Sequence, residues 1–417
     1  MSLLPDRAPF RQSRDFRFLW ASGFITYLGS MMTFVALPFQ VKQLTGSFVA
    51  VGVLGLVQMV PLIVCGLWGG ALADRLDRRT MVLITEVGAG LCVALLLLNT
   101  ISRHPQVWLV YCAAFLFTVF TSLQRPSLEG LLPRVVQHDQ LAAASAWMSM
   151  RWSTTAIAGP ALGGVIIAAV GVQGVYAADI ATFGLSVAAL WRLRPSPGAP
   201  TESVSSAAAI LAGARYAASR PDLLGTYVVD IIAMVFAYSN AIFPFMAQSF
   251  REPYALGLLY SADAVGALLV SATSGWVSKV HRHGRMVAIA AVAWGAAVAA
   301  IGLTHNLWVT LALLGVAGAA DMVSGIFRQL MWNQTIPDEY RGRLAGIEMI
   351  SYSFGPKAGQ MRVSLFADWF GIPRALASGG ILCIAGTSIA AATLRRFWGY
   401  DCRTDENAVR ERAARAA

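Results

Sequence analysis

Three aspartates stand inside long apolar stretches of the sequence, where an ionised side chain is costly. They are Asp230, Asp263 and Asp321. A carboxylate at the centre of a membrane-spanning helix costs about 2.5–3.5 kcal/mol on insertion scales, so we expect each to have a function. Desolvation favours the protonated form and a nearby cation favours the ionised form, so a site that alternates between the two can load and release a proton. We expect Asp321 first, Asp230 second and Asp263 third as proton carriers; the alternative for each is a static ion pair between helices.

Basic, aromatic and methionine side chains lie in the same kind of stretch. We interpret Arg151 and Lys357 as counter-ions of the aspartates or as ligands of an anionic substrate group. Arg362 is a third cation inside a predicted span, and we assign no role to it. Because aromatic and methionine surfaces suit varied ligands, an apolar pocket is a second expectation. Its candidate lining residues are Tyr27, Met31, Phe236, Tyr238 and Trp332. The alternative for these is contact with lipid or neighbouring helices.

Two further carboxylates, Glu86 and Asp179, are expected to be structural, pairing with loops or lying near an interface. A separate charged cluster occupies GGALADRLDRRTMV, residues 69–82, where five charges fall between Asp74 and Arg79. Arginines at a membrane boundary are explained by topology, but the two aspartates of this cluster are not.

The elements that must position these residues are helices that cross a membrane. The chain has 417 residues, of which 57% are hydrophobic and 13% charged, whereas a soluble domain carries about 25% charged residues. Because the apolar runs are continuous and about 20 residues long, they predict α-helices and not the alternating strands of a barrel. We place twelve spans at 18–41, 47–73, 80–101, 105–127, 140–169, 174–193, 222–248, 255–279, 285–303, 307–331, 344–370 and 374–396.

The distribution of basic residues predicts the orientation. Most of the 32 Lys and Arg residues fall in loops on one side, and the other side holds only Lys42, Arg103, Arg251 and Arg374. The positive-inside rule therefore predicts that both termini are cytoplasmic. Since topology explains the net charge of +10, we expect no nucleic-acid partner. The first apolar run is too long for a cleavable signal peptide.

The chain reads as two six-helix halves. The stretch RPSPGAPTESVSSAAA is rich in Pro, Ser, Gly and Ala and is typical of a linker. We therefore predict bundles at 1–193 and 222–397, a linker at 194–221 and a cytoplasmic tail at 398–417. At an offset of 205, GALADRLDRRTMVLI aligns with GWVSKVHRHGRMVAI, which indicates a duplicated unit. Two such halves are typical of a transporter with a substrate site between them near the midplane.

The charged cluster carries a family resemblance. Gly70, Asp74, Arg75, Arg78 and Arg79 form G-x-x-x-D-R-x-x-R-R, which resembles the signature loop G-x-x-x-D-R-x-G-R-R of the major facilitator superfamily. Asp77 stands where the family commonly has Gly, so we expect that turn to differ. The pattern LLPRVVQHDQLAAASA resembles the enterobactin-exporter and macrolide-efflux branch of proton-coupled exporters.

A second motif, GPALGG at 159–164, resembles the antiporter motif of proton-coupled exporters. Gly159, Pro160, Gly163 and Gly164 match it, and Thr155 replaces an upstream glycine. Physically, glycines four residues apart permit close helix packing and Pro160 bends the helix. Antiport is what the resemblance adds to that packing role.

The resemblance implies a cytoplasmic latch formed by Gly70, Asp74, Arg75, Arg78 and Arg79. Asp74 would lie near the N-terminus of the eleventh helix, where the dipole is positive. Arg78 would pair with Glu129, or second with Asp139, and Arg328 with Glu339 or Asp338. The latch would stabilise the outward-open state; the alternative is that the arginines set topology alone.

The resemblance and the residues together predict an all-α membrane protein with twelve helices in two pseudo-symmetric bundles. We expect a proton-coupled exporter of hydrophobic or amphipathic small molecules (a drug, a siderophore or a secondary metabolite) in the bacterial inner membrane. It is expected to act by alternating access as a monomer, with protons, substrate and the lipid bilayer as partners. The alternatives are a proton-coupled importer and, less favoured, a non-transporting membrane sensor. Since no P-loop or metal-ligand pattern occurs, we expect no cofactor, no metal and no enzymatic activity.

Overall fold

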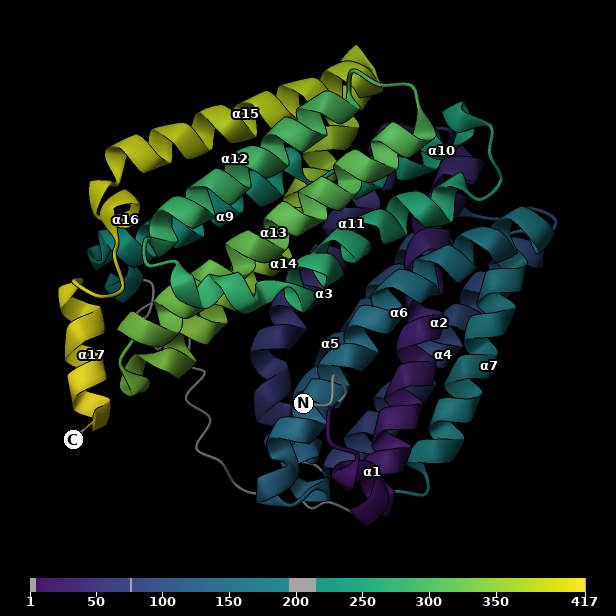
Figure 1. Cartoon of the computed structure of the whole chain (residues 1–417). Coiled ribbons are helices and arrows are strands. Elements are labelled where there is room, and N and C mark those ends of the chain that lie inside the picture. Colours follow the sequence, from purple (N-terminus) through teal and green to yellow (C-terminus); the bar gives the residue numbers. More distant parts are fainter. Residues whose placement is uncertain (1–4, 76, 195–214, 417) are drawn as a thin grey trace. The chain divides into compact units, whose positions relative to one another are not determined.

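The computed structural model describes residues 5–75, 77–194 and 215–416, and the regular structure of these residues is helical throughout. The chain divides into two compact units (Figure 1). Unit 1 comprises Met1–Gly46, Val57–Ser203 and Arg251–Ser261, and unit 2 comprises Ser47–Leu56, Val204–Phe250 and Ala262–Ala417. Helices α3 (Phe48–Arg75) and α11 (Ala255–Ala272) therefore each contribute residues to both units.

The other helices belong to one unit each. Unit 1 holds α1 (Ala8–Gln12), α2 (Arg14–Thr45), α4 (Arg78–Ile101), α5 (Val107–Val135), η1 (His138–Gln140), α6 (Leu141–Val170) and α7 (Val172–Leu190). Unit 2 holds α9 (Pro221–Ala237), η2 (Asn240–Ile242), α10 (Phe243–Phe250), η3 (Ser274–Lys279), α12 (His283–Ile301), α13 (Leu307–Thr335), α14 (Asp338–Phe370), α15 (Ile372–Thr393), α16 (Arg395–Gly399) and α17 (Glu406–Ala416).

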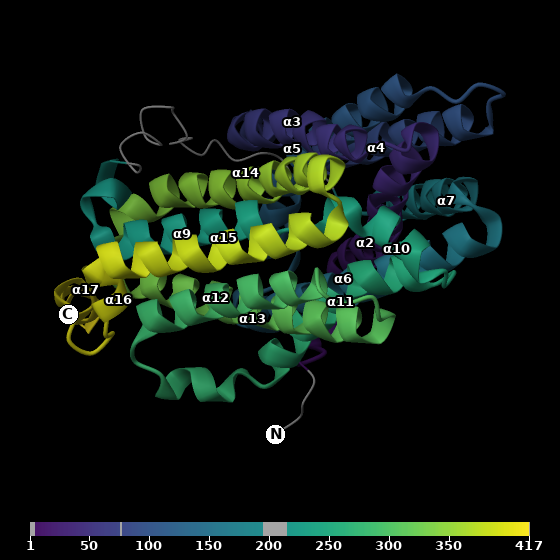
Figure 2. The same cartoon turned by 90° about the horizontal axis from the view of Figure 1, so that it is seen from above.

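The two units repeat one pattern of helix packing. In unit 1, α2 packs on α6 and α7, and α4 packs on α5 and α7. In unit 2, α9 packs on α14 and α15, and α12 packs on α13 and α15, and Figure 2 shows α15 alongside α9 and α12. The connections repeat as well, because Gly171 (φ 78°) separates α6 from α7 and Gly371 (φ 81°) separates α14 from α15. Glycine adopts this left-handed conformation without a Cβ clash.

Eleven helices in the described residues are long and apolar enough to cross a membrane. The predicted span 344–370 is the one not among them. It lies in α14, which has 33 residues and is long enough, but its sequence includes Lys357, Arg362 and Asp368. Helix α14 is therefore present where the sequence predicts a span. Its charged residues, and not its length, distinguish it from the other eleven helices.

The stretch 398–417, predicted to be a separate tail, packs on unit 2. Helix α16 contacts α9 and α12, and α17 contacts α13. The backbone N–H of Cys402 donates to the His281 carbonyl at 3.0 Å, and Arg412 donates to the Cys402 carbonyl at 2.9 Å. One backbone hydrogen bond therefore joins this stretch to the loop before α12, and the Arg412 side chain bonds within the stretch itself.

Candidate functional site

An ion pair joins two helices inside unit 2. Asp230 of α9 is 5% exposed, and its carboxylate pairs with the guanidinium of Arg328 on α13. Arg328 was expected to pair with Glu339 or Asp338, whose side chains lie outside the described residues. The sequence missed the Asp230 partner because α9 and α13 are far apart in the chain and meet only through tertiary packing.

The other two predicted proton carriers lie beside this pair. Asp321 is on α13, seven residues before Arg328, and interacts electrostatically with both Arg328 and Asp230. Asp263 of α11 interacts in turn with Asp321. The backbones meet closely here, since a Cβ on Gly318 would lie 2.0 Å from the Asp263 carbonyl oxygen. Asp230 and Asp321 therefore lie near Arg328, and Asp263 lies next to Asp321.

A break in the seventh predicted span borders this cluster. Helix α9 ends at Ala237, and the short η2 begins at Asn240. Tyr238 lies in the break; its hydroxyl accepts a hydrogen bond from the Asn240 amide at 3.1 Å and is near enough to Asp263 and Asp321 to interact with them electrostatically. The sequence predicted Tyr238 as a pocket residue but gave no signal for the break.

Arg362 of α14 satisfies the carbonyls that this break leaves without helical partners. Its guanidinium donates to the carbonyls of Val235 at 3.3 Å and Ala375 at 3.1 Å, and also to that of Phe236. The last carbonyls of any helix lack intrahelical donors, and a buried cation can supply them. Arg362 is thus a C-terminal cap for α9 and not a counter-ion. Lys357 lies half-buried on the same helix.

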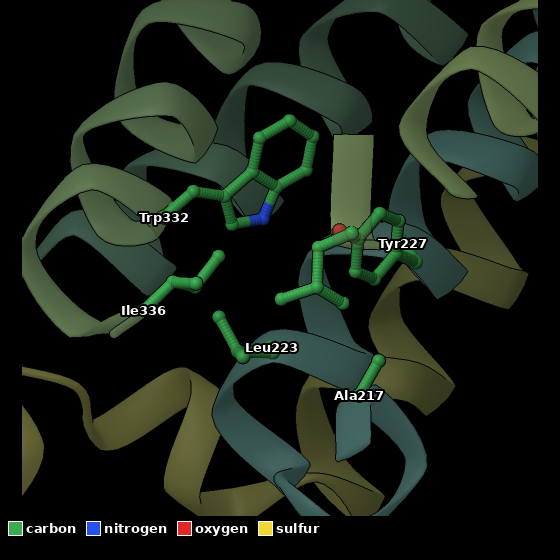
Figure 3. Packing of buried hydrophobic residues seen from close by; sticks show 6 residues of the cluster. Ala217, Leu223, Tyr227, Trp332 and Ile336 are labelled. Atoms are coloured by element: carbon green, nitrogen blue, oxygen red, sulfur yellow. The ribbon is translucent and has the colours of Figure 1, made fainter. Parts of the chain in front are cut away.

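Trp332, expected to line a pocket, is part of the packed interior of unit 2. It belongs to the buried cluster shown in Figure 3, and its ring stacks on Tyr227 with centroids 5.1 Å apart. The indole N–H donates to the Thr226 hydroxyl at 2.9 Å. With its polar atom bonded and 8% of its surface exposed, Trp332 is a packing residue, which corrects the expectation.

In unit 1, Arg151 of α6 lies against α2. Its guanidinium carbon is 5.1 Å from the centre of the Tyr27 ring, and that ring meets Trp152 edge-on at 5.4 Å. Arg151 is 8% exposed, its Nε makes no hydrogen bond, and no carboxylate of the described residues pairs with it. The predicted counter-ion role therefore has no partner within the described residues, and binding of an anionic group remains.

The GPALGG segment packs as its glycines predict. A Cβ on Gly159 would lie 2.4 Å from Cβ of Met31, and one on Gly163 would lie 3.0 Å from the Met32 backbone. A Cβ on Gly164 would lie 2.4 Å from the Gly257 backbone. Met31 is therefore held between helices in unit 1. Pro160 lies within α6 between these contacts.

The latch residues are only partly described. The side chains of Gly70, Asp74 and Arg75 lie outside the described residues. The Arg78 guanidinium lies over α5, with Nη1 1.2 Å from where a Cβ on Gly130 would stand. Glu129, its expected partner, pairs instead with Arg125 at 3.0 Å on the exposed surface, since the two are one turn apart.

Arg79 and Asp77 have clear local roles. Arg79 donates to the carbonyls of Trp191 and Leu190 at the end of α7, where a cation also complements the helix dipole. Asp77 is the N-cap of α4, and its carboxylate accepts the Thr80 backbone N–H at 2.8 Å. Its φ of −60° is ordinary, so the turn forms without the family's glycine.

Glu86 and Asp179, expected to be structural and to pair with loops or lie near an interface, are buried in the interior of unit 1. Glu86 of α4 is 2% exposed, and it accepts hydrogen bonds from Thr26 on α2 and Gln124 on α5. Asp179 of α7 is fully buried and accepts from Thr33 on α2. These partners therefore lie on helices and not in loops, because tertiary packing and not sequence neighbourhood supplies them.

The sequence matches the family model described as transmembrane secretion effector over residues 5–408. Similar curated proteins include the enterobactin exporter EntS of Shigella boydii serotype 18 and that of Escherichia coli O157:H7, each 25% identical over 386 residues, 92% of this chain and 93% of the relative. Similar solved structures include a POT family transporter in complex with 5-aminolevulinic acid (TM-score 0.75, 12% identity, 94% of this chain and 99% of that one). Another is a bacterial homologue of the iron transporter ferroportin in an inward-facing state (TM-score 0.69, 14% identity, 92% and 98%).

Proposed function

Because this chain belongs to the transmembrane secretion effector family of major facilitator transporters, which are membrane transporters and not enzymes, we propose that it exports amphipathic, siderophore-like small molecules in exchange for protons. The export direction is supported by the relatives named as enterobactin exporters. We place the protein in the bacterial inner membrane with both termini cytoplasmic, as the positive-inside rule favours.

The observation that carries the proton coupling is the aspartate cluster of unit 2. Asp230 pairs with Arg328, Asp321 lies near both of them, and Asp263 lies next to Asp321. Three neighbouring carboxylates repel one another, so at least one favours its protonated form while Arg328 compensates another. Asp321 is seven residues from Arg328 on one helix, about two turns, so the two lie along the same face.

A shift of the Arg328 guanidinium towards Asp321 would release the Asp321 proton and favour protonation of Asp230. Alternating access then requires only that the two arrangements face opposite sides of the membrane. One proton entering down 100 mV releases about 2.3 kcal/mol. At about 1.4 kcal/mol per tenfold gradient, one proton supports a substrate gradient of roughly 50-fold.

The substrate contacts we propose are in unit 1. Arg151 is buried over the Tyr27 ring beside Trp152, with no carboxylate partner in the described residues. A guanidinium held on an aromatic face suits an anionic group that is attached to an apolar or aromatic body. This geometry favours amphipathic anions over cationic drugs as substrates.

The test uses the purified full-length protein in proteoliposomes with an acidic interior. We use enterobactin as the probe, because the relatives are named for it. Wild-type protein should accumulate the probe inside as protons leave. Asp321→Asn mimics the protonated form and should retain downhill exchange while losing uphill accumulation.

The Asp230→Asn and Arg151→Met variants sharpen the result. Should Asp321→Asn accumulate probe normally while Asp230→Asn does not, the coupling proton belongs to Asp230; Asp263 is next if both are active. Arg151→Met should lose probe binding but not the fold. Accumulation that is insensitive to the proton gradient in the wild type would exclude proton coupling.

A further inference from the structure

One face of α2 forms a polar seam through the interior of unit 1. Thr26, Gly29 and Thr33 occur at spacings of three and four residues, which places them on the same helix face. The seam faces α4 and α7, where it meets Glu86 and Asp179. The seam extends for about 10 Å along the helix axis, from Thr26 to Thr33.

Both carboxylates are saturated by donors along this seam. Glu86 accepts from the Thr26 hydroxyl on one oxygen and from the Gln124 amide on the other. Asp179 accepts from the Thr33 hydroxyl on Oδ2 and from the Thr182 hydroxyl, at 2.9 Å, on Oδ1. Gly29 makes room for the second group, since a Cβ there would lie 2.1 Å from Asp179 Oδ1.

No cation compensates either charge among the described residues. The groups that interact with Glu86 and Asp179 are hydroxyls, one amide and each other. From α7, Tyr176 also faces Asp179, and its hydroxyl donates to Gln40 at 2.7 Å. No basic side chain of α2, α4, α5 or α7 is among the groups that contact the pair within the described residues. An ionised, uncompensated carboxylate at this burial is costly, and protonation relieves the cost.

A buried hydroxyl of α7 lies beside Glu86. Ser186 is fully buried, and its Oγ is next to the Glu86 carboxylate. Because Thr26 and Gln124 already donate to both Glu86 oxygens, a proton added to Glu86 needs an acceptor. Ser186 Oγ can serve, since a serine hydroxyl both donates and accepts.

We propose that Glu86 and Asp179 form a second proton-binding site, inside unit 1, that is loaded and emptied during transport. A proton from water adds to a carboxylate oxygen, the resulting O–H donates to Ser186 Oγ, and release reverses both steps. The functional part of this inference rests on the proposed proton coupling. The protonation itself does not, and the experiment separates them.

The first measurement is the infrared carboxyl band of the purified, reconstituted wild-type protein as pH is varied. We expect a band of protonated buried carboxyl that titrates, and that Glu86→Gln and Asp179→Asn each remove part of it. Ser186→Ala should shift the pH at which the band titrates, because a hydroxyl next to the Glu86 carboxyl is lost. Asp401→Asn is the control, since Asp401 is ion-paired with Arg403 outside the membrane spans. A band unchanged in Glu86→Gln and Asp179→Asn overturns the proposal.

The second measurement is transport of enterobactin in proteoliposomes. Glu86→Gln preserves side-chain shape and should keep downhill exchange but lose uphill accumulation. If the band titrates but both variants retain uphill accumulation with unchanged proton movement, the pair is a static network and the proposal is wrong. If the wild type shows the titrating band but moves no probe, the export proposal fails and the protonation assignment stands.

A sodium site is the competing use of the same oxygen-rich ligand set. Thermal unfolding of the wild type in sodium chloride and in potassium chloride distinguishes the two. Equal stability in both salts supports the proton site. Stabilisation by sodium that disappears in Glu86→Gln would assign a sodium site and overturn the proton assignment.

Discussion

Units 1 and 2 share one packing pattern but treat buried charge in opposite ways. In unit 2, Asp230 pairs with Arg328, and Arg362 donates to three backbone carbonyls. In unit 1, the Glu86 and Asp179 carboxylates accept from hydroxyl and amide groups, and Arg151 faces the Tyr27 ring. Asp230 and Arg362 of unit 2 are therefore compensated by an opposite charge or by backbone dipoles, whereas Glu86, Asp179 and Arg151 of unit 1 meet neutral groups.

The two units therefore share a pattern of helix packing but carry their ionisable residues at different positions. At the offset of 205 that aligns the halves, Glu86 falls on Ala291 and Asp230 falls on Ile25. The helix pairs recur, but the ionisable residues do not. A compensated pair can exchange partners, while an uncompensated carboxyl is poised to gain or lose a proton. Each prediction below alters one of these arrangements.

The largest effect is expected from Asp230→Ala. Removing one partner of a buried ion pair leaves Arg328 buried without its carboxylate, which typically costs about 3–5 kcal/mol. We expect a loss of this order in the free energy of unfolding, measured in mixed micelles. Transport should be lost as well.

The matched control removes both charges. The double variant Asp230→Leu with Arg328→Met should recover most of the stability, because an ion pair can often be replaced by apolar groups of similar volume. It should not recover transport. A double variant as unstable as Asp230→Ala would show that these side chains stabilise unit 2 by something other than their pairing.

The next effect compares the two buried arginines. Arg362→Met leaves the Val235 and Phe236 carbonyls at the end of α9 without this donor, and unfolding should become easier by about 2–3 kcal/mol. Arg151→Met removes a cation that has no hydrogen-bonded carbonyl or carboxylate partner in the described residues, so we expect a change within about 1 kcal/mol. Unfolding midpoints of both variants test this expectation. Equal losses of stability would contradict the proposed difference between the two units.

Continuous apolar runs could predict the helices, because lipid penalises polar groups at each position of a span. The partners of buried charges could not be predicted in this way. Thr26 and Glu86 are 60 residues apart, and Thr33 and Asp179 are 146 apart. The sequence indicates that the buried charges of Asp230 and Glu86 need compensating partners. Only helix packing decides whether the partner is an arginine or a threonine.

The same limit applies to aromatic residues and to the charged loop. Nothing in the sequence separates Trp332, packed on Tyr227, from a pocket residue, since both uses favour an aromatic side chain in a span. Arg79 lies in the motif that resembles a latch, yet it bonds the end of α7. A motif identifies the residues, while the acceptors they meet depend on where distant helices end.

Small-residue packing should be a property that the units share. Gly164 meets the Gly257 backbone in unit 1, and a Cβ on Gly380 would lie 2.2 Å from the Gly295 carbonyl oxygen in unit 2. An added methyl group in either place should cost about 1–3 kcal/mol. We expect similar losses for Gly164→Ala and Gly380→Ala. Gly184→Ala is the control, because a Cβ there meets nothing within 4 Å; a loss confined to one unit would show that the scaffolds differ too.

The smallest effect concerns the first turns of α4 and α12, which align at the same offset. Asp77 caps α4 with its side chain, whereas Arg282 stands at the N-cap of α12 and makes no side-chain cap hydrogen bond. Losing an N-cap carboxylate typically costs about 1 kcal/mol. We therefore expect Asp77→Ala to lower the free energy of unfolding by that amount, Asp77→Asn to be near neutral, and Arg282→Ala to cost no cap energy.

Arg282→Asp should stabilise α12 by a few tenths of a kcal/mol or more, since it supplies both a cap and a favourable charge at the helix N-terminus. If Asp77→Ala is neutral, the cap does not stabilise α4. The aspartate in place of the family's glycine would then need another explanation, such as a role in the transport cycle. Initial transport rates of the same variant would detect such a role.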